Sequence, residues 1–235
     1  MSPAHASLTP PSVSRLLPAL FALPVSAYEL STPGSPDWLL PEELASIRGA
    51  VPARIAEFAA GRQCARAAMQ ALGIAVHTPL LRGAHREPLW PTGLCGSITH
   101  TAGYCAAVVA HANHCAGIGI DAEHCGHVGP ELWPALFDAT EVAALQALAP
   151  AACAALATLL FAVKEAFFKS QFALTAAVPD FTDVAFRTHG PLAQRGTLDL
   201  VRVSDSRLAG LTARSTFRYA LHGPFALAAA TVHPG

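Results

Sequence analysis

Three carboxylates with apolar neighbours are the residues of this sequence best placed to do chemistry. Asp121 and Glu123 lie two apart in Gly-Ile-Gly-Ile-Asp-Ala-Glu, and Glu165 lies in Phe-Ala-Val-Lys-Glu-Ala-Phe-Phe-Lys-Ser. A carboxylate in apolar surroundings must either find a cation or take up a proton. Carboxylates of this kind suit Mg²⁺, which usually binds a few of them together with the phosphates of a substrate. We therefore expect the three to share one divalent metal ion that holds a phosphate-bearing substrate.

The positions of these acids predict the elements that carry them. Residues 116–123 are expected to form a strand, on which Asp121 and Glu123 share a face with Cα atoms about 6.6 Å apart. A helix is expected over residues 151–172, where Glu165 shares a face with three phenylalanines. The alternative for Glu165 is an exposed ion pair with Lys169, worth only about 0.2–0.5 kcal/mol. The aromatic neighbours argue against that alternative, whereas two solvated acids at a strand end remain an alternative for the other pair.

The residues next to the acids suggest how a ligand is received. Gly119 precedes the acids on the expected strand, and a residue without a side chain leaves room for a ligand to approach. The only two lysines of the chain, Lys164 and Lys169, flank Glu165. We expect their compact ammonium groups to offset negative charge on the phosphates.

Arginines elsewhere are candidates for binding phosphate. On a helix expected over residues 52–72, Arg62 and Arg66 lie four apart and share a face, as two residues of a solvated surface also would. A loop marked by Gly and Pro carries Arg82, His85 and Arg86. A surface loop with arginines for solubility explains that cluster equally well.

Composition limits the class of protein. The 235 residues are 52% hydrophobic and 13% charged, which predicts a globular chain with a full core. A formal net charge of −1 argues against a general nucleic-acid binder. Every apolar run is interrupted before the roughly 20 residues of a membrane span, and prolines within residues 16–25 disfavour a secretory signal. Six cysteines without a CxxC pair indicate reduced thiols in a cytoplasmic protein.

The remaining pattern changes character near residue 179. Before it, a strand is expected over residues 21–29, a buried strand over residues 104–110, and helices from residue 41 and over residues 130–148. After it, alternating and β-rich segments predict three or four antiparallel strands.

Four passages together resemble a known family. They start at Phe58, Arg86, Gly119 and Phe161, and they include Phe-Ala-Ala-Gly-Arg-Gln-Cys-Ala-Arg, Arg-Glu-Pro-Leu-Trp-Pro-Thr-Gly with Gly-Ser-Ile-Thr-His-Thr, Gly-Ile-Asp-Ala-Glu, and Phe-Ala-Val-Lys-Glu-Ala-Phe-Phe-Lys. In order and spacing they are similar to the Sfp/EntD-type 4'-phosphopantetheinyl transferases, in particular the siderophore-synthesis branch. The family often has Trp in place of Phe161 and a larger apolar residue in place of Ala122, and neither departure removes a functional group.

The resemblance implies a fold and a reaction. The implied fold is α/β (α+β), with two similar halves, residues 1–115 and 116–235, related by a pseudo-twofold axis. Each half would be a small, mainly antiparallel sheet packed on helices, with the active site in the cleft between them. The implied reaction moves the 4'-phosphopantetheine arm of coenzyme A to a serine of an apo acyl or peptidyl carrier protein. Mg²⁺ would be the cofactor, adenosine 3',5'-bisphosphate the product, and a monomer the active form.

The resemblance also assigns roles to the candidate residues. Asp121, Glu123 and Glu165 are expected to hold the metal ion, and Glu165 to take the proton of the carrier serine directly or through water. Lys164 and Lys169 are expected to act at the phosphates. The residues expected to bind coenzyme A are basic or carry a hydroxyl: Arg62, Arg66, Arg86, Ser97, His100 and Thr101.

The carrier is expected to be an acidic helical domain. An exposed apolar patch beside the cleft, at Leu136, Phe137 and Leu145, is the expected place for it to dock. Charged side chains there should raise the apparent KM for the carrier and leave coenzyme A binding intact.

Two other functions remain as alternatives. One is a non-catalytic coenzyme A binder, which an intact carboxylate triad disfavours because binding alone does not need Glu165. The other is a zinc-binding module, since Cys and His are zinc ligands. Its candidate ligands match no standard zinc spacing and crowd into one short span: His111, His114, Cys115, His124, Cys125 and His127.

Overall fold

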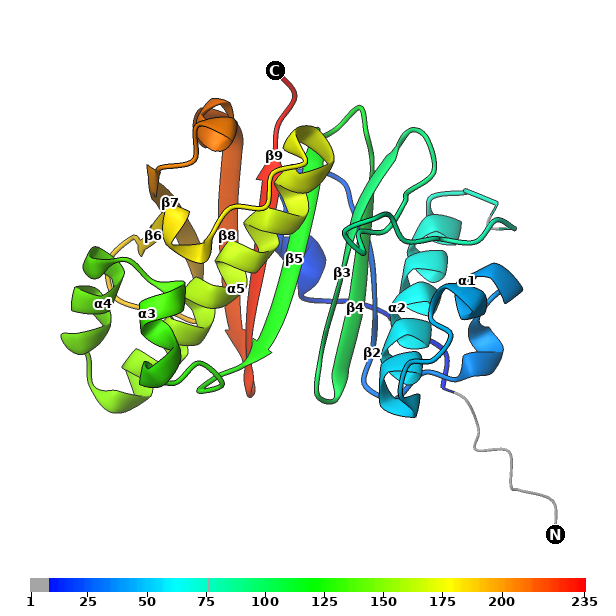
Figure 1. Cartoon of the computed structure of the whole chain (residues 1–235), viewed down its shortest axis with the longest axis horizontal. Coiled ribbons are helices and arrows are strands. Elements are labelled where there is room, and N and C mark those ends of the chain that lie inside the picture. The colour runs from blue at the N-terminus through cyan, green and yellow to red at the C-terminus, as the bar shows by residue number, and fades with distance from the viewer. Residues whose placement is uncertain (1–8, 76) are drawn as a thin grey trace, which may run out of the picture.

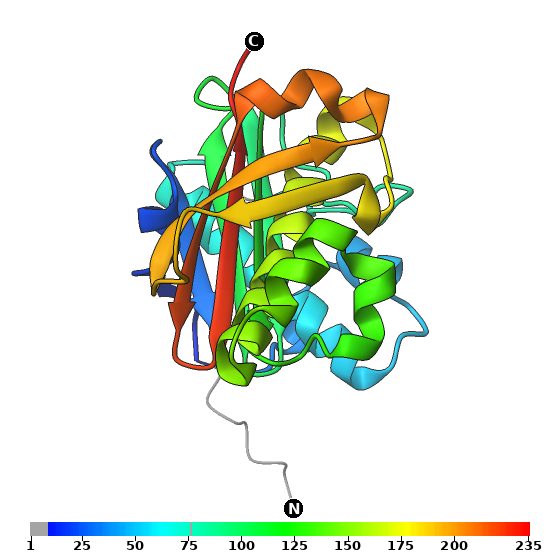
Figure 2. The same cartoon turned by 90° about the vertical axis from the view of Figure 1, so that its left-hand side faces the viewer.

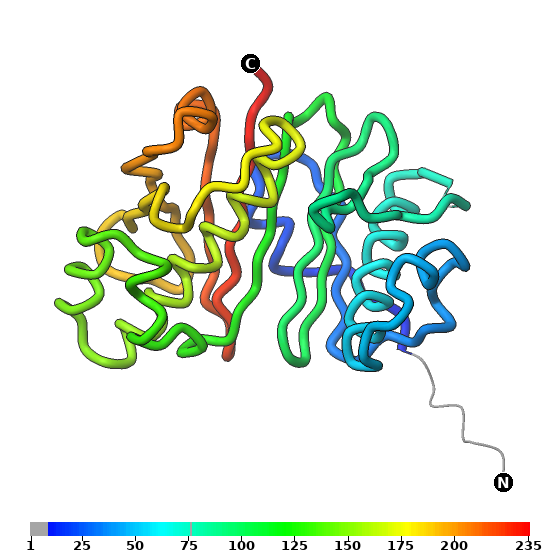
Figure 3. The backbone as a smooth tube through the Cα atoms, in the orientation of Figure 1, coloured from blue at the N-terminus to red at the C-terminus, as the bar shows by residue number. Residues whose placement is uncertain are grey.

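The chain folds as two antiparallel sheets whose edges lie next to each other, each packed on one long helix (Figure 1). The computed structural model describes residues 9–75 and 77–235. The first sheet has the strand order β1-β2-β4-β3 and the second the order β5-β9-β8-β7-β6. The chain crosses from one sheet to the other between β4 and β5, as the tube in Figure 3 shows. The expected class, antiparallel sheets packed on helices, is confirmed.

The elements follow the expected order with additions. The first half comprises β1 (Ser12–Val13), β2 (Ser26–Leu30), α1 (Pro41–Ser46), α2 (Pro52–Ala71), β3 (Leu94–Thr101) and β4 (Tyr104–His111). The second comprises β5 (Gly117–His124), α3 (Trp133–Leu136), α4 (Ala139–Gln146), α5 (Pro150–Thr175), β6 (Val184–Thr188), β7 (Arg195–Val203), β8 (Ser215–His222) and β9 (Phe225–Val232). β3 was not expected as a strand, because its Gly, Ser, Thr and His residues show no apolar alternation. Short 3₁₀ helices join these elements, among them η1 (Leu17–Leu20) and η4 (Phe181–Asp183).

The ends of α2 follow local rules. Pro52 occupies the first turn, where its missing N–H costs no hydrogen bond. The helix ends just before Gly73, whose φ of 77° is accessible to glycine with little strain. Small buried residues such as Ala60 and Ala65 allow α2 to pack against β2 and β4.

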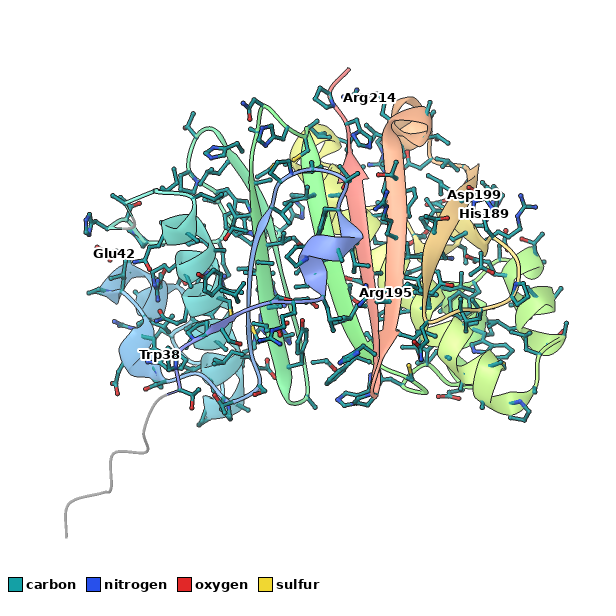
Figure 4. All side chains as sticks on the ribbon, turned by 180° about the vertical axis from the view of Figure 1, so that it is seen from behind. Trp38, Glu42, His189, Arg195, Asp199 and Arg214 are labelled. Atoms are coloured by element: carbon teal, nitrogen blue, oxygen red, sulfur yellow. The ribbon has the colours of Figure 1, made fainter. Side chains whose placement is uncertain are left out.

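The two faces of β5 pack against different neighbours. Ile118, Ile120 and Ala122 point into a cluster that also contains Leu17 and Leu20 of η1. In the rear view of Figure 4, η1 accordingly crosses the back of the second sheet. The opposite face carries the glycines and acids of β5 and packs against α5, so the expected division of the strand into an apolar and an acidic face is confirmed.

Gly119 makes room for α5 and not for a ligand, which corrects the expectation. A Cβ atom at Gly119 would lie 1.8 Å from the carbonyl oxygen of Ala166, and one at Gly117 would lie 2.0 Å from that of Ser170. The two glycines therefore let α5 lie directly against β5. This close approach brings the helix residues that follow Phe161 to the acids of the strand.

Gly119→Ala should destabilise the protein by about 1–3 kcal/mol or more, because the helix backbone must move to admit the methyl group. Urea unfolding measures the loss. Gly210→Ala is the matched control, since a Cβ atom at Gly210 would have no atom of the described residues within 4 Å beyond its chain neighbours. Equal stability of the two variants would contradict the close packing of α5 on β5.

α5 is a core helix, although its length and composition alone would allow it to cross a membrane. It has 26 residues, and 56% of its most apolar window is buried inside the protein. The expectation that every apolar run is too short to span a membrane is therefore wrong for α5, by length and composition alone. Its apolar residues are explained by the sheet on one side and by α3, α4 and η4 on the other, as the side view in Figure 2 shows.

The predicted carrier-docking patch lies in the core. Phe137 is 3% exposed and Leu145 is fully buried, and Leu136 packs against the same cluster under α4. That prediction is wrong because an amphipathic helix shows from its sequence which residues are apolar, but not whether another element covers them.

Candidate active site

A cleft of about 1050 Å³ lies between the two halves. Its walls come from α2 and β3 on one side and from α5 on the other, and residues 84–90 of the connecting loop also contribute. This volume is at the upper end of the range of about 300–1,000 Å³ that small-molecule sites occupy. Glu165 and Lys169 line the cleft from α5. The active site is expected between the two halves, and its placement in this cleft remains a prediction.

Side-chain hydroxyls join β3 and β5, which belong to different sheets. Ser97 accepts a hydrogen bond from the backbone N–H of Ile120 at 3.0 Å, and Thr99 accepts one from the N–H of Ala122 at 3.0 Å. These residues alternate on β3, so they all face β5. The hydroxyl groups therefore replace the backbone ladder that a continuous sheet would have.

We call this junction between β3 and β5 the seam. Asp121 lies in the seam, next to α5. Its Oδ1 accepts hydrogen bonds from Thr99 at 3.1 Å and from the ammonium of Lys169 at 2.7 Å. The ammonium also donates to the carbonyl oxygen of Ile120 at 3.2 Å. Asp121 is only 4% exposed, and its other oxygen, Oδ2, is buried without a hydrogen-bond partner among the residues that the structure describes. Lys169 thus links a buried, incompletely satisfied carboxylate to the cleft.

Two further carboxylates place excess negative charge around Lys169. Burial raises the pKa of Glu165, with Asp121 adding to the shift and Lys169 opposing it. Burial, followed by repulsion from Asp121, also raises the pKa of Glu123, whose carboxylate accepts a hydrogen bond from Thr101 at 3.3 Å. Burial by itself lowers the pKa of Lys169, but the three carboxylates outweigh it and the net shift is upwards. The single positive charge of Lys169 therefore lies near three carboxylates.

The expected metal centre is not preformed. Within residues 9–75 and 77–235, no three His, Cys, Asp or Glu side chains lie together closely enough to hold a metal ion. The chemistry of the donor set nevertheless fits a divalent cation. The unpaired Oδ2 of Asp121 and the raised pKa values of Glu123 and Glu165 mark negative charge that Lys169 does not fully offset.

Arg62 brings a buried positive charge to the same cleft. Its Nε donates to the carbonyl oxygen of Leu80 at 2.7 Å, and its guanidinium lies 4.0 Å from the centre of the Phe58 ring. Arg62 is 4% exposed, and its Nη2 is buried with no hydrogen-bond partner within residues 9–75 and 77–235. Burial lowers the pKa of Arg62 to about 10. A buried guanidinium with an unused donor is suited to bind an anion such as phosphate.

Two models of known protein families match most of the chain. A family model described as "4'-phosphopantetheinyl transferase N-terminal domain" matches residues 41–110. A second, described as "4'-phosphopantetheinyl transferase superfamily", matches residues 117–228 and includes the three carboxylates. The chain belongs to this superfamily. The two models divide between β4 and β5, where the sheets of this superfamily member also divide.

Individual transferases match shorter stretches of this superfamily member. "4'-phosphopantetheinyl transferase Svp" of Streptomyces mobaraensis is 42% identical over 91 residues, which are 39% of this chain and 36% of that protein. "4'-phosphopantetheinyl transferase PptT" of Mycobacterium tuberculosis is 47% identical over 64 residues, 27% of this chain and 28% of that protein. The matched regions thus span about a third of these curated relatives.

One solved structure shows a distant similarity. Thermotoga maritima holo-[acyl-carrier-protein] synthase (AcpS) has a TM-score of 0.39 and 22% sequence identity. The match covers 51% of this superfamily member and 64% of that chain. A similarity of this size does not bear on the site.

Two basic residues predicted for the phosphates have structural roles in this superfamily member. Arg66 binds the buried carboxylate of Glu43 at 2.8 Å and the carbonyl oxygen of Trp38, so it ties α2 to α1. Lys164 is fully buried and donates to Glu141 at 2.7 Å. Both predictions are corrected, because sequence spacing fixes a helical face but does not reveal which carboxylate lies opposite it.

Other predicted contacts are placed in or beside the cleft. Arg86 and His100 line it, as does Ser97 on β3, while Thr101 does not. The hydroxyl of Ser97 is engaged in the seam, and that of Thr101 reaches Glu123. These two hydroxyls therefore hold β5 in place, and a role in binding coenzyme A remains a prediction for Arg86 and His100.

Sequence inspection missed Arg54. It lines the cleft at the start of α2, and its Nη1 lies 2.7 Å from Nε2 of His100. Because a guanidinium only donates hydrogen bonds, Nε2 of His100 must be the acceptor. Arg54 and Glu57 also form an ion pair at 3.1 Å. Arg54 lies eight residues before Arg62 on the same helix, and this two-turn spacing was the available signal.

The zinc alternative finds no support in the described part of the chain. No three of its candidate ligands gather there closely enough to hold an ion. Cys115 is fully buried against Cys95, and Nε2 of His124 donates to the carbonyl oxygen of Ala102 at 2.8 Å. His111 and His114 lie edge to face, with ring centres 6.1 Å apart.

Thr99→Val should cost about 1–3 kcal/mol of stability, because the buried N–H of Ala122 and the carboxylate of Asp121 each lose a partner. Valine keeps the shape of threonine, so packing is preserved. Thr101→Val is the matched control, since its half-buried hydroxyl makes one longer bond to Glu123. Equal urea midpoints for the two variants would contradict a structural role of Thr99 in the seam.

Proposed function

We propose that this protein transfers the 4'-phosphopantetheine arm of coenzyme A to a serine of an apo acyl or peptidyl carrier protein. The observation that carries the proposal is the charge arrangement in one cleft. Glu165 lines one side together with Lys169, which binds the buried Asp121, and the other side holds Arg62, whose Nη2 has no hydrogen-bond partner among the described residues. A phosphate-bearing ligand bound with a divalent cation would complement both. Membership of the superfamily supports the same reaction.

Basic side chains of the cleft would hold the phosphates of coenzyme A. Arg62 offers its free Nη2, and Arg86 and His100 also line the cleft. The contact between Arg54 and His100 would fix the imidazole with its other nitrogen as a donor. We assign the 3'-phosphate and the pyrophosphate to this group of residues.

Asp121, Glu123 and Glu165 would hold the metal ion, for which we propose Mg²⁺. Once bound, the ion would neutralise charge on the pyrophosphate and stabilise the departing oxygen. Binding of such an ion can be measured separately from enzymatic activity. Mn²⁺ binding, followed by its electron paramagnetic resonance signal, should weaken in Asp121→Asn.

The proposed step is a displacement at phosphorus. The hydroxyl oxygen of the carrier serine bonds to the phosphorus that bears the pantetheine arm. The bond from that phosphorus to the bridging oxygen breaks, and adenosine 3',5'-bisphosphate leaves with the bonding electrons. Glu165 would take the serine proton, a role that its raised pKa favours. Lys169, whose pKa is raised, stays protonated and would offset charge on the phosphates.

One assay tests the function directly. The protein is incubated with coenzyme A, Mg²⁺ and a panel of apo-carriers from siderophore, polyketide and fatty-acid synthesis. Modified carrier gains the mass of the pantetheine arm. From the resemblance to the siderophore-synthesis branch, we propose that nonribosomal peptide carriers of that pathway react fastest. No mass gain on any carrier would reject the transferase proposal.

The non-catalytic alternative predicts no transfer by the unchanged protein, whereas Glu165→Gln tests the role of Glu165. If Glu165 is the base, this variant should bind coenzyme A normally and modify carrier slowly. Full transfer activity would remove the base assignment. We further propose that the two halves, residues 1–115 and 116–235, form the active site together in a monomeric, cytoplasmic protein. Size-exclusion chromatography would test whether the protein is a monomer.

A further inference from the structure

Cys95 and Cys115 meet at the seam between the two sheets. Their sulfur atoms lie 2.8 Å apart, although the residues are 20 positions apart in the chain. Cys95 belongs to β3 of the first sheet, and Cys115 lies two residues before the start of β5 in the second. Both thiols are free in the structure, and a disulfide bond would need a sulfur separation of about 2.05 Å. Closing the pair therefore requires a small displacement.

The two thiols differ in access. Cys95 is partly exposed and is one of the residues that line the cleft. Cys115 is fully buried and does not line the cleft. This combination supplies an attacking thiol at the surface of a cavity and a second thiol in contact behind it.

The electrostatics of the pair favour the same order of events. The hydrogen bond from Cys115 lowers the pKa of Cys95, and its counterpart raises the pKa of Cys115. The thiolate is the nucleophile in disulfide exchange. Cys95 is thus the first of the two to react.

We propose that Cys95 and Cys115 form a reversible dithiol–disulfide site that small disulfides such as glutathione disulfide close and small thiols such as reduced glutathione reopen. The Cys95 thiolate attacks one glutathione sulfur, and the first glutathione leaves as its thiolate. The Cys115 thiolate then attacks the Cys95 sulfur and releases the second glutathione. Two protein thiols are oxidised, one glutathione disulfide is reduced to two thiols, and the two protein protons go to the departing thiolates.

The bond would tie β3 to the chain entering β5 and so fix one side of the cleft. Cross-linking positions 95 and 115 restricts the unfolded chain, which should raise the urea midpoint of the oxidised protein. Dithiothreitol should return the midpoint to that of the reduced protein. The site itself does not depend on the transferase proposal, because it is formed and measured without coenzyme A.

The test is oxidation of the folded, reduced protein with glutathione disulfide, followed by intact mass and peptide mapping. We expect loss of two hydrogen atoms and a linked peptide containing Cys95 and Cys115. Cys115→Ser should instead accumulate glutathione on Cys95, whereas Cys95→Ser should leave Cys115 unmodified. Cys125→Ser, which removes an exposed cysteine outside the pair, should form the link as the unchanged protein does.

Other outcomes would overturn the inference. They are a protein that stays reduced at Cys95 while the exposed Cys125 is glutathionylated, or a link that forms only in urea. A separate arm adds coenzyme A before the oxidant. Slower linking would support binding of coenzyme A over Cys95, and unchanged linking would count against that placement of the ligand while leaving the thiol site intact.

Discussion

Asp121→Asn should reduce carrier modification by about 100-fold or more while the protein stays folded. Even residues that only support a metal ligand typically cost about 10–100-fold when replaced. The substitution keeps the shape of the side chain but removes the charge that meets Lys169 at 2.7 Å. It also removes the buried Oδ2 to which we assign the cation. Initial rates at saturating coenzyme A and carrier measure the effect.

A matched carboxylate-to-amide change controls for this result. Asp199→Asn alters a partly exposed acid on β7 that pairs with His189 at 2.9 Å, near the edge of the second sheet that lies away from the first sheet (Figure 4). That variant should keep the rate of the unchanged protein. Unaltered turnover in Asp121→Asn, with Mn²⁺ binding also unaltered, would exclude Asp121 from the site.

Lys164→Met should lower the free energy of unfolding by about 3–5 kcal/mol, which is typical of breaking one side of a buried ion pair. Lys164 is fully buried, and it donates to Glu141 and to the carbonyl oxygens of Leu136 and Phe181. These bonds connect α5 to α3, α4 and η4. Burial lowers the pKa of Lys164 and raises that of Glu141, so each charge depends on the other. Urea unfolding measures the loss.

Two further variants decide whether the pair causes the loss. Adding Glu141→Gln to Lys164→Met should recover part of the stability, because no unpaired charge remains buried. Arg187→Met, at an exposed pair whose charged atoms are 4.0 Å apart, should change stability by less than about 1 kcal/mol. A Lys164→Met protein as stable as Arg187→Met would contradict the structural role of Lys164.

The sequence by itself determined the local geometry of the site. A period of two placed Asp121 and Glu123 on one face of β5, and the structure bears this out. A period of 3.6 placed Glu165 beside aromatic residues of α5, where Phe161 and Phe168 pack around Phe181. These patterns are readable because the side-chain direction within one element depends only on its own repeat.

Only the tertiary structure decided which candidates meet. Lys164 and Lys169 look alike in sequence, but five residues turn an α-helix by about 140° beyond a full turn, so they point to different neighbours. One meets Glu141 in the core and the other meets Asp121 beside the cleft. Arg66 likewise forms an ion pair with Glu43, a residue distant from it in the sequence.

The close contacts across the seam were equally invisible to the sequence. The pairing of Cys95 with Cys115 and the packing of Gly119 on α5 depend on how two sheets and a helix are placed. Residue type and spacing determine what a side chain can do, whereas its partner is set by the packing of elements distant in the chain. The sequence of this protein therefore determined its elements and its acidic face, and the fold decided which charges and thiols lie together.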